Sequence, residues 1–133
     1  MATKVQVVFD CADPARQAAF WEAALHYISP DPPPPHSSWD DFLRAQGVPE
    51  EQWNDANAVE DPDGEGPRLY FQKVPEGKVA KNRMHLDLNV GGGASVPLDE
   101  RRARVDAEVA RLKGLGATDE RGAIEKNGEY WVR

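Results

Sequence analysis

Apolar and polar residues alternate strictly over residues 84–90, which is the period of a β-strand with two different faces. The apolar residues of this segment share one face, whereas His85 and Asp87 point to the other. A similar segment lies near the N-terminus, at residues 5–10, and Gln6 takes the place of His85 when the two are aligned. The pattern therefore predicts two related strands, each with an apolar face and a polar face.

Each predicted strand leads into an amphipathic helix. Asp13 followed by Pro14 is a helix-start signal, because an N-cap carboxylate precedes a proline at the first helical position. We therefore predict a first helix over residues 13–27 and, after a glycine-rich loop, a second over about 99–113 with Gly114 in its stop signal. The buried side of the second helix is expected to contain Val105, Val109 and Leu112.

Prolines dominate residues 29–35, so this segment is expected to be extended and non-helical. It opens an insert at about 29–56, in which Ser37 or Ser38 caps a short helix that ends at Gly47. Strands are also predicted over residues 57–61 and 68–74, with weaker ones over 117–122 and 129–133, and a polar linker over 75–82.

The order of a strand, a helix and further short strands occurs twice, which makes it an internal repeat. The first half runs over about 4–74 and the second over about 83–133. The second half has room for only two strands after its helix, and the sequence stops at Arg133 within a predicted strand. We therefore expect that a final strand of the repeat is missing from the given chain.

The bulk composition limits the classes of function. At 133 residues, with 40% hydrophobic content, the chain is long enough for one domain with a core. Its net charge of −7 argues against nucleic acid and anionic membranes as partners, since little positive surface is present to release phosphate counterions. No stretch is apolar enough to span a bilayer, and the N-terminus has no signal-peptide pattern. Cys11 is the single cysteine and is interpreted as a packed or bystander thiol, so a reducing, cytoplasmic location is expected.

Three runs of residues, together with the repeat, resemble one known superfamily. The runs are VFDCADP at 8–14 leading to AFW at 19–21, LYFQKVP at 69–75, and KNRMHLDL at 81–88. They resemble the vicinal oxygen chelate superfamily, in its glyoxalase-like and bleomycin-resistance-like branch. The resemblance implies an α+β fold, in which residues 1–133 form one domain of two βαβββ modules. The modules would build a curved, mixed-sheet cup with the helices outside.

The resemblance also implies which side chains face the cup and which pack on the helices. The packed set would be Val5, Val7 and Phe9 of the first strand, with Met84, Leu86 and Leu88 of the later one. The cup would be lined by Gln6, Val8, Tyr70, Gln72, His85 and Asp87.

Metal-using members of the superfamily place one ligand on each of four strands. The matching positions here are Gln6, Gln72 (or Tyr70, if the register slips) and His85, while the strand that would supply a glutamate is missing. This neutral set is a poor cage for nickel, zinc, manganese or iron, because such sites combine imidazoles with a charged carboxylate or thiolate. A divalent metal is therefore not favoured, although the missing glutamate or Asp87 could supply the charge.

His85 and Asp87 each keep two interpretations. His85 is either a metal or ligand contact, or an imidazole hydrogen-bonded to its neighbours on the cup wall. Asp87 is either a solvated partner of a nearby cation, or a carboxylate that orients His85 or acts as a catalytic base.

Aromatic residues in two places are further candidates for ligand contacts. Trp39, Phe42 and Trp53 lie in the polar, proline-rich insert and either seal a core or form a lid over the cup. Tyr130 and Trp131 alternate on the last strand, so one of them, with Trp131 favoured as a ligand contact, should face the cup.

The sequence thus predicts a cytoplasmic glyoxalase-like domain that binds a small organic molecule and forms a homodimer. If it is an enzyme, the resemblance implies lyase, isomerase or dioxygenase chemistry at a metal, with Asp87 moving a proton. The alternative is a non-catalytic protein that sequesters an antibiotic-like compound without metal. A third interpretation is a regulatory or structural domain with no ligand.

Overall fold

The fold is α+β, and the computed structural model describes all residues from Met1 to Arg133. The chain forms two compact units, Met1–Val79 and Ala80–Arg133. The boundary falls within residues 75–82, the segment predicted as a polar linker. None of the helices combines the length and apolar character that a membrane crossing requires.

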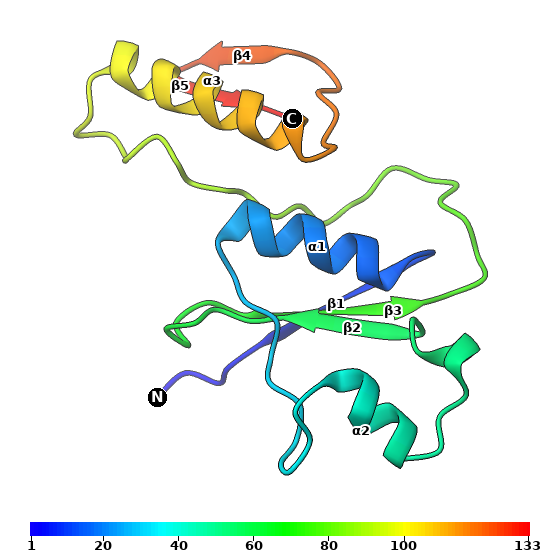
Figure 1. The fold of residues 1–133 in the computed structure, drawn as a ribbon. Helices are drawn as coiled ribbons and strands as arrows, with labels where there is room; N and C mark the ends of the chain where they lie inside the picture. The colour runs from blue at the N-terminus through cyan, green and yellow to red at the C-terminus, as the bar shows by residue number, and fades with distance from the viewer. The chain divides into compact units, whose positions relative to one another are not determined.

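A three-stranded mixed sheet organises the first unit (Figure 1). Its strands are β1 (Gln6–Cys11), β2 (Ala56–Val59) and β3 (Arg68–Lys73), in the order β1-β3-β2. β3 lies in the centre and pairs in parallel with β1 and antiparallel with β2. The predicted strands at 5–10, 57–61 and 68–74 are therefore present, with small shifts in their ends.

The core of the first unit lies between one face of this sheet and a helix. Leu69 and Phe71 are almost fully buried, as the alternation in β3 predicts. Phe9 stacks on Phe71 with ring centroids 5.8 Å apart and on Trp21 of the helix at 6.1 Å. Stacked aromatic rings combine a large buried apolar area with favourable quadrupole geometry, so this contact fixes the helix on the sheet.

The helix α1 (Pro14–Leu25) begins at the predicted signal. Asp13 is its N-cap, and the carboxylate oxygen Oδ1 accepts a hydrogen bond from the backbone N–H of Arg16 at 3.2 Å. The helix ends two residues earlier than predicted, because His26 adopts a left-handed conformation with φ 57°.

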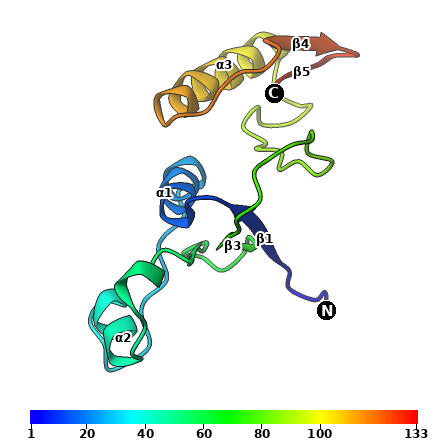
Figure 2. The same cartoon turned by 90° about the vertical axis from the view of Figure 1, so that its right-hand side faces the viewer.

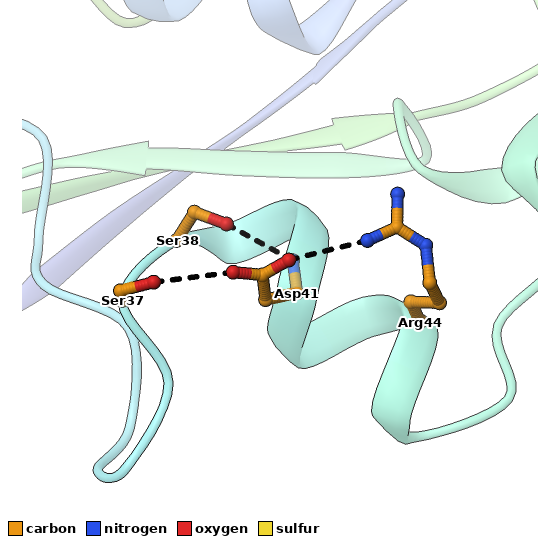
Figure 3. Close-up of polar contacts among 4 residues, drawn as sticks. All are labelled: Ser37, Ser38, Asp41 and Arg44. Carbon is orange, nitrogen blue, oxygen red and sulfur yellow. Dashed lines mark hydrogen bonds and ion pairs between the residues drawn. The ribbon is translucent and has the colours of Figure 1, made fainter.

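The insert forms the short helix α2 (Trp39–Ala45) and one 3-10 turn, η1 (Glu50–Gln52). Ser38 is the N-cap of α2, and its hydroxyl accepts from the backbone N–H of Asp41 at 3.1 Å (Figure 3). The Asp41 carboxylate also accepts from the Ser37 hydroxyl and from Arg44, so one side chain joins both ends of the helix. Within this unit, α1 covers one face of the sheet and α2 lies on the other side (Figures 1 and 2).

The second unit consists of α3 (Leu98–Gly114) packed with a hairpin of β4 (Ala123–Lys126) and β5 (Glu129–Val132). The helix matches its prediction to within one residue at each end. Asn127 and Gly128 form the turn of the hairpin with φ values of 54° and 75°. Two consecutive positive φ angles are the signature of a type I′ turn, whose twist matches that of the flanking strands.

Two predicted strands are absent from this unit. Residues 84–90 form no strand, although exposed and half-buried residues still alternate from His85 onward. Alternation reports two faces, but a strand also needs a hydrogen-bonded partner, and here the N–H of Val90 bonds locally to the carbonyl of Leu88. The strand predicted at 117–122 is replaced by a turn, because the Asp119 carboxylate accepts from the backbone N–H groups of Arg121 and Gly122.

Some predicted core residues are also not buried. Val5 precedes the first paired residue of β1 and is 66% exposed, and Met84 is 64% exposed. Val105, Val109 and Leu112 of α3 are half-buried, since a helix and a two-stranded hairpin enclose little volume.

Candidate functional site

The candidate site of the first unit is the face of the sheet that points away from α1. Partners in a sheet register share a face, so the pairing of Val8 with Tyr70 places both opposite the face that carries Phe9 and Phe71. Val8 is 48% exposed and Tyr70 is half-buried. We name this surface the polar face; it carries Gln6, Val8 and Asp10 of β1, Arg68, Tyr70 and Gln72 of β3, and Ala56 and Ala58 of β2.

The four cup residues predicted in this unit therefore share one face, but they do not converge on one point. Gln6 pairs with Arg68, whereas Gln72 pairs with Asp10. The two glutamines are thus separated by four positions along the strands, which corresponds to roughly 13 Å at the usual rise per residue. They lie at opposite ends of the β1–β3 pair.

Arg68 contacts two of the predicted site residues. Its Nη1 donates a hydrogen bond to Oε1 of Gln6 at 2.6 Å. Its guanidinium carbon lies 5.8 Å from the ring centroid of Tyr70, which is a cation–π distance. One end of the polar face therefore carries an oriented positive charge beside an aromatic ring.

This geometry does not fit a divalent metal held by Gln6 and Gln72. The amide oxygen Oε1 is the atom through which Gln6 would bind a metal, and it accepts a hydrogen bond from the Arg68 guanidinium. The guanidinium is a permanent cation that cannot act as a ligand and repels a second cation nearby. No cluster of three or more His, Cys, Asp or Glu side chains with metal-site geometry is found. The predicted set of Gln6, Gln72 and His85 stays a prediction that the first unit does not support.

His85 and Asp87 lie in the second unit, on the extended segment at 84–90. Both side chains are exposed. Leu86, which lies between them, and Leu88, which follows Asp87, are half-buried. The alternation of exposed and half-buried residues that the sequence predicts is therefore present here, although the segment forms no strand. Whether His85 binds a ligand and whether Asp87 acts as a base both stay predictions.

Trp131 lies on β5 and is half-buried. It pairs with Ile124 of β4, so the two share one face of the hairpin. Tyr130 belongs to the other face, where its hydroxyl donates to Oδ1 of Asp106 on α3 at 2.6 Å. This hydrogen bond raises the pKa of the Tyr130 hydroxyl, because the bond and the nearby carboxylate both favour the neutral form.

The aromatic residues of the insert contact one another and the adjacent chain. Trp39 packs edge-on against Phe42, and its indole N–H donates to the carbonyl of Pro30 at 2.7 Å. Trp53 donates to the carbonyl of Val48, and Arg44 lies 5.3 Å from the centroid of its ring. Trp39 is 38% exposed, and its role as a ligand contact stays a prediction.

A shallow, open hollow of about 560 Å³ lies at the C-terminal ends of β1 and β3. Asp10 is the only residue of the polar face in its lining. The remaining lining residues belong to the segment that follows β3, and they are Val74, Glu76, Gly77 and Lys78. Three of the five lining residues are charged, whereas ligand pockets are usually mainly apolar.

Cys11 ends β1 and is half-buried. Burial is the largest cause of a raised pKa for its thiol, and the charges of Asp13 and Asp10 act in the same direction. A raised pKa lowers the fraction of reactive thiolate, so these contacts favour the bystander thiol expected from the sequence.

Comparison with known protein families gives a match over most of the chain. The Glyoxalase-like domain family matches residues 6–132, which is nearly the whole chain. The chain belongs to the glyoxalase-like domain family. This family is part of the vicinal oxygen chelate superfamily, so the resemblance read from the three sequence runs is confirmed. No curated protein and no solved structure matches the chain.

Sequence reasoning did not select Arg68, the residue that contacts both Gln6 and Tyr70. A signal was nevertheless present, because Arg68 alternates with Tyr70 and Gln72 and must share their face. Asp10 was also not selected, although it follows Gln6 and Val8 at the same two-residue period and must share their face. Only the register shows that Arg68, and not Gln72, lies next to Gln6.

Proposed function

We propose that this glyoxalase-like domain binds a small organic molecule on the polar face of its sheet and does so without a catalytic metal. The observation that supports this function is the hydrogen bond from Arg68 to Gln6. It places a permanent cation beside the amide oxygen that a metal would need, and this cation repels a second one.

The same face offers the mixture of contacts that a small-molecule site requires. Val8 supplies exposed apolar surface and Tyr70 a half-buried aromatic ring, and Gln6, Arg68 and Gln72 supply polar groups around them. Pockets for organic ligands combine an apolar lining with a few polar groups that fix orientation. Among the interpretations of the sequence, metal-free sequestration of a compound is therefore favoured over catalysis.

Elemental analysis of the purified full chain tests this proposal, followed by thermal unfolding with added nickel, zinc, manganese and iron(II). We expect no stoichiometric metal and no metal-specific rise in the unfolding temperature. Stoichiometric metal that is lost in a His85→Ala variant would contradict the proposal. It would favour a lyase, isomerase or dioxygenase in which His85 holds the ion and Asp87 moves a proton.

A Gln6→Ala variant serves as the matched control for the metal measurement. Gln6 lies in the first unit and His85 in the second, so the two variants test the predicted ligand of each unit separately. Metal binding that depends on His85 but not on Gln6 would place the ion outside the polar face.

We also propose that the protein acts as a cytoplasmic homodimer. β1 is an edge strand of the three-stranded sheet, and unpaired strand edges favour association with another chain. Light scattering coupled to gel filtration measures the mass directly, and a monomer at micromolar concentration would contradict the dimer.

A further inference from the structure

Arg68 carries a positive charge that no carboxylate of the chain neutralises. Four arginines of the protein form ion pairs with Asp or Glu side chains, and Arg68 is not among them. Its single side-chain hydrogen bond goes to the neutral amide oxygen of Gln6. A guanidinium has five N–H donors, so most of its donors remain available for a ligand.

The guanidinium is also held in one orientation. The bond to Gln6 fixes one end of the fork, and the cation–π contact at 5.8 Å holds the group beside the Tyr70 ring. A pre-oriented, planar fork loses little conformational freedom when it binds a carboxylate through two parallel hydrogen bonds. Arg68 is half-buried, which lowers solvent screening of its charge.

We propose that Arg68 is the anion-binding residue of the polar face, with Gln6 as its positioning residue, and that the ligand is a planar organic carboxylate. This inference rests on the proposed small-molecule binding function and names the class of its ligand. The carboxylate binds the free edge of the guanidinium, and the planar body of the ligand packs on the exposed side chain of Val8, beside the Tyr70 ring. These two residues are register partners, so their side chains are neighbours on the same face.

The opposite end of the polar face limits how many charges the ligand can carry. Asp10 is paired with Gln72, four positions from the pair of Gln6 and Arg68. That separation is roughly 13 Å along the strands. A second anionic group reaching this end would meet the carboxylate of Asp10. The inference therefore specifies one anionic group, at the Arg68 end.

Backbone-amide NMR titration of the full chain tests the inference with benzoate and naphthoate, compared with their neutral amides, benzamide and naphthamide. We expect both carboxylates to shift the amide signals of Gln6, Val8, Arg68 and Tyr70. A charge-assisted pair should make them bind about tenfold or more tightly than the matching amides.

Three variants separate the contribution of Arg68 from general charge and from folding. Arg68→Gln should abolish the preference for carboxylate over amide. Lys73→Gln removes one positive charge from the same strand but on the opposite face, since Lys73 pairs with Cys11, and should leave the preference intact. Arg68→Lys keeps the positive charge but not the planar guanidinium, and it should give an intermediate preference. This variant also tests the inference if Arg68→Gln does not give the spectrum of a folded protein.

The results distinguish this inference from the function on which it rests. Equal binding of amides and carboxylates on the polar face, unchanged in Arg68→Gln, would overturn the anion-binding role while small-molecule binding remained. Absence of any shift on the polar face with all four probes would overturn the anion-binding role and count against the proposed function as well. An equal loss of the preference in Lys73→Gln would mean that overall charge, and not Arg68, attracts the carboxylate.

Discussion

Asn54 and Asp13 are 41 residues apart in the sequence and joined by a hydrogen bond of 2.9 Å from Nδ2 to Oδ1. The oxygen Oδ1 of the same amide accepts a hydrogen bond from the backbone N–H of Ala15 at 2.8 Å. Asn54 therefore caps the start of α1 a second time, from the end of the insert. This pair of bonds joins the insert to the helix that covers the sheet.

Replacement of Asn54 by alanine should weaken the start of α1. The hydrogen bond from Asn54 is the largest cause that holds the pKa of Asp13 below its ordinary value, followed by the bond from Arg16. A lowered folded-state pKa contributes stability that is present above about pH 4, the unfolded value, and lost as the pH falls through the folded value. We expect the urea midpoint of Asn54→Ala to fall at neutral pH and to approach that of the parent in acid.

Urea titrations at about pH 6 and about pH 3 measure this difference above and below the unfolded-state pKa of the carboxylate. Gln17→Ala is the control, because Gln17 is an exposed residue of the same helix. An Asn54→Ala deficit that stays constant between the two pH values would show that the Asp13 contact does not contribute in solution.

Phe71 and Gln72 are neighbours on β3 with opposite environments, and the two alanine variants should differ widely. Phe71 is fully buried and stacked on Phe9, whereas Gln72 is exposed. Phe71→Ala should lower the free energy of unfolding by about 3–5 kcal/mol through lost burial and a cavity. Gln72→Ala should change it by no more than about 0.5 kcal/mol. Chemical denaturation of both variants checks the assignment of faces, and comparable losses would reverse it.

Gly66 is packed too closely against Tyr27 to accept a side chain. A Cβ atom at this position would overlap the Tyr27 hydroxyl oxygen and lie 3.3 Å from Oδ2 of Asp61. The backbone N–H of Gly66 also donates to that carboxylate at 2.7 Å, which restricts movement of the loop. Gly66→Ala should therefore lower the thermal unfolding temperature. Adding Tyr27→Phe removes the overlapping oxygen and should recover part of the loss.

Purely additive effects in a double-mutant cycle of Gly66 and Tyr27 would mean that the two residues do not clash. Gly77→Ala is the matched glycine control in the same unit, because nothing lies within 4 Å of its Cβ position.

The hairpin of the second unit should depend on Gly128. This residue has φ 75°, and the guanidinium of Arg101 donates to its carbonyl at 3.0 Å, which joins the turn to α3. A Cβ in the left-handed region costs about 1–2 kcal/mol, so Gly128→Ala should destabilise the second unit by that amount. Gly114→Ala, at the end of α3 with open space around it, should leave stability unchanged or raise it slightly. Thermal unfolding followed by circular dichroism compares them, and equal effects would argue against the turn geometry.

Local signals predicted most of the elements of this protein. The start of α1 at Asp13 and Pro14, the cap of α2 at Ser37 or Ser38 and the faces of β3 were predicted correctly from neighbouring residues, and the structure selects Ser38 as the cap. The turn at Asn127 and Gly128 was equally visible, since Asn-Gly is a strong hairpin signal, and it would have placed β4 correctly at 123–126. The predicted strand at 117–122 is wrong because it was placed without reference to this turn.

The sequence by itself determined which residues of β1 and β3 share a face, because side-chain direction in a strand depends only on a period of two. It did not determine which residues on that face are neighbours. The tertiary structure paired Gln6 with Arg68 instead of Gln72, left residues 84–90 without a partner strand, and brought Asn54 to Asp13. Register and partner choice are set by hydrogen bonds and packing between distant segments, and a local pattern carries no information about either.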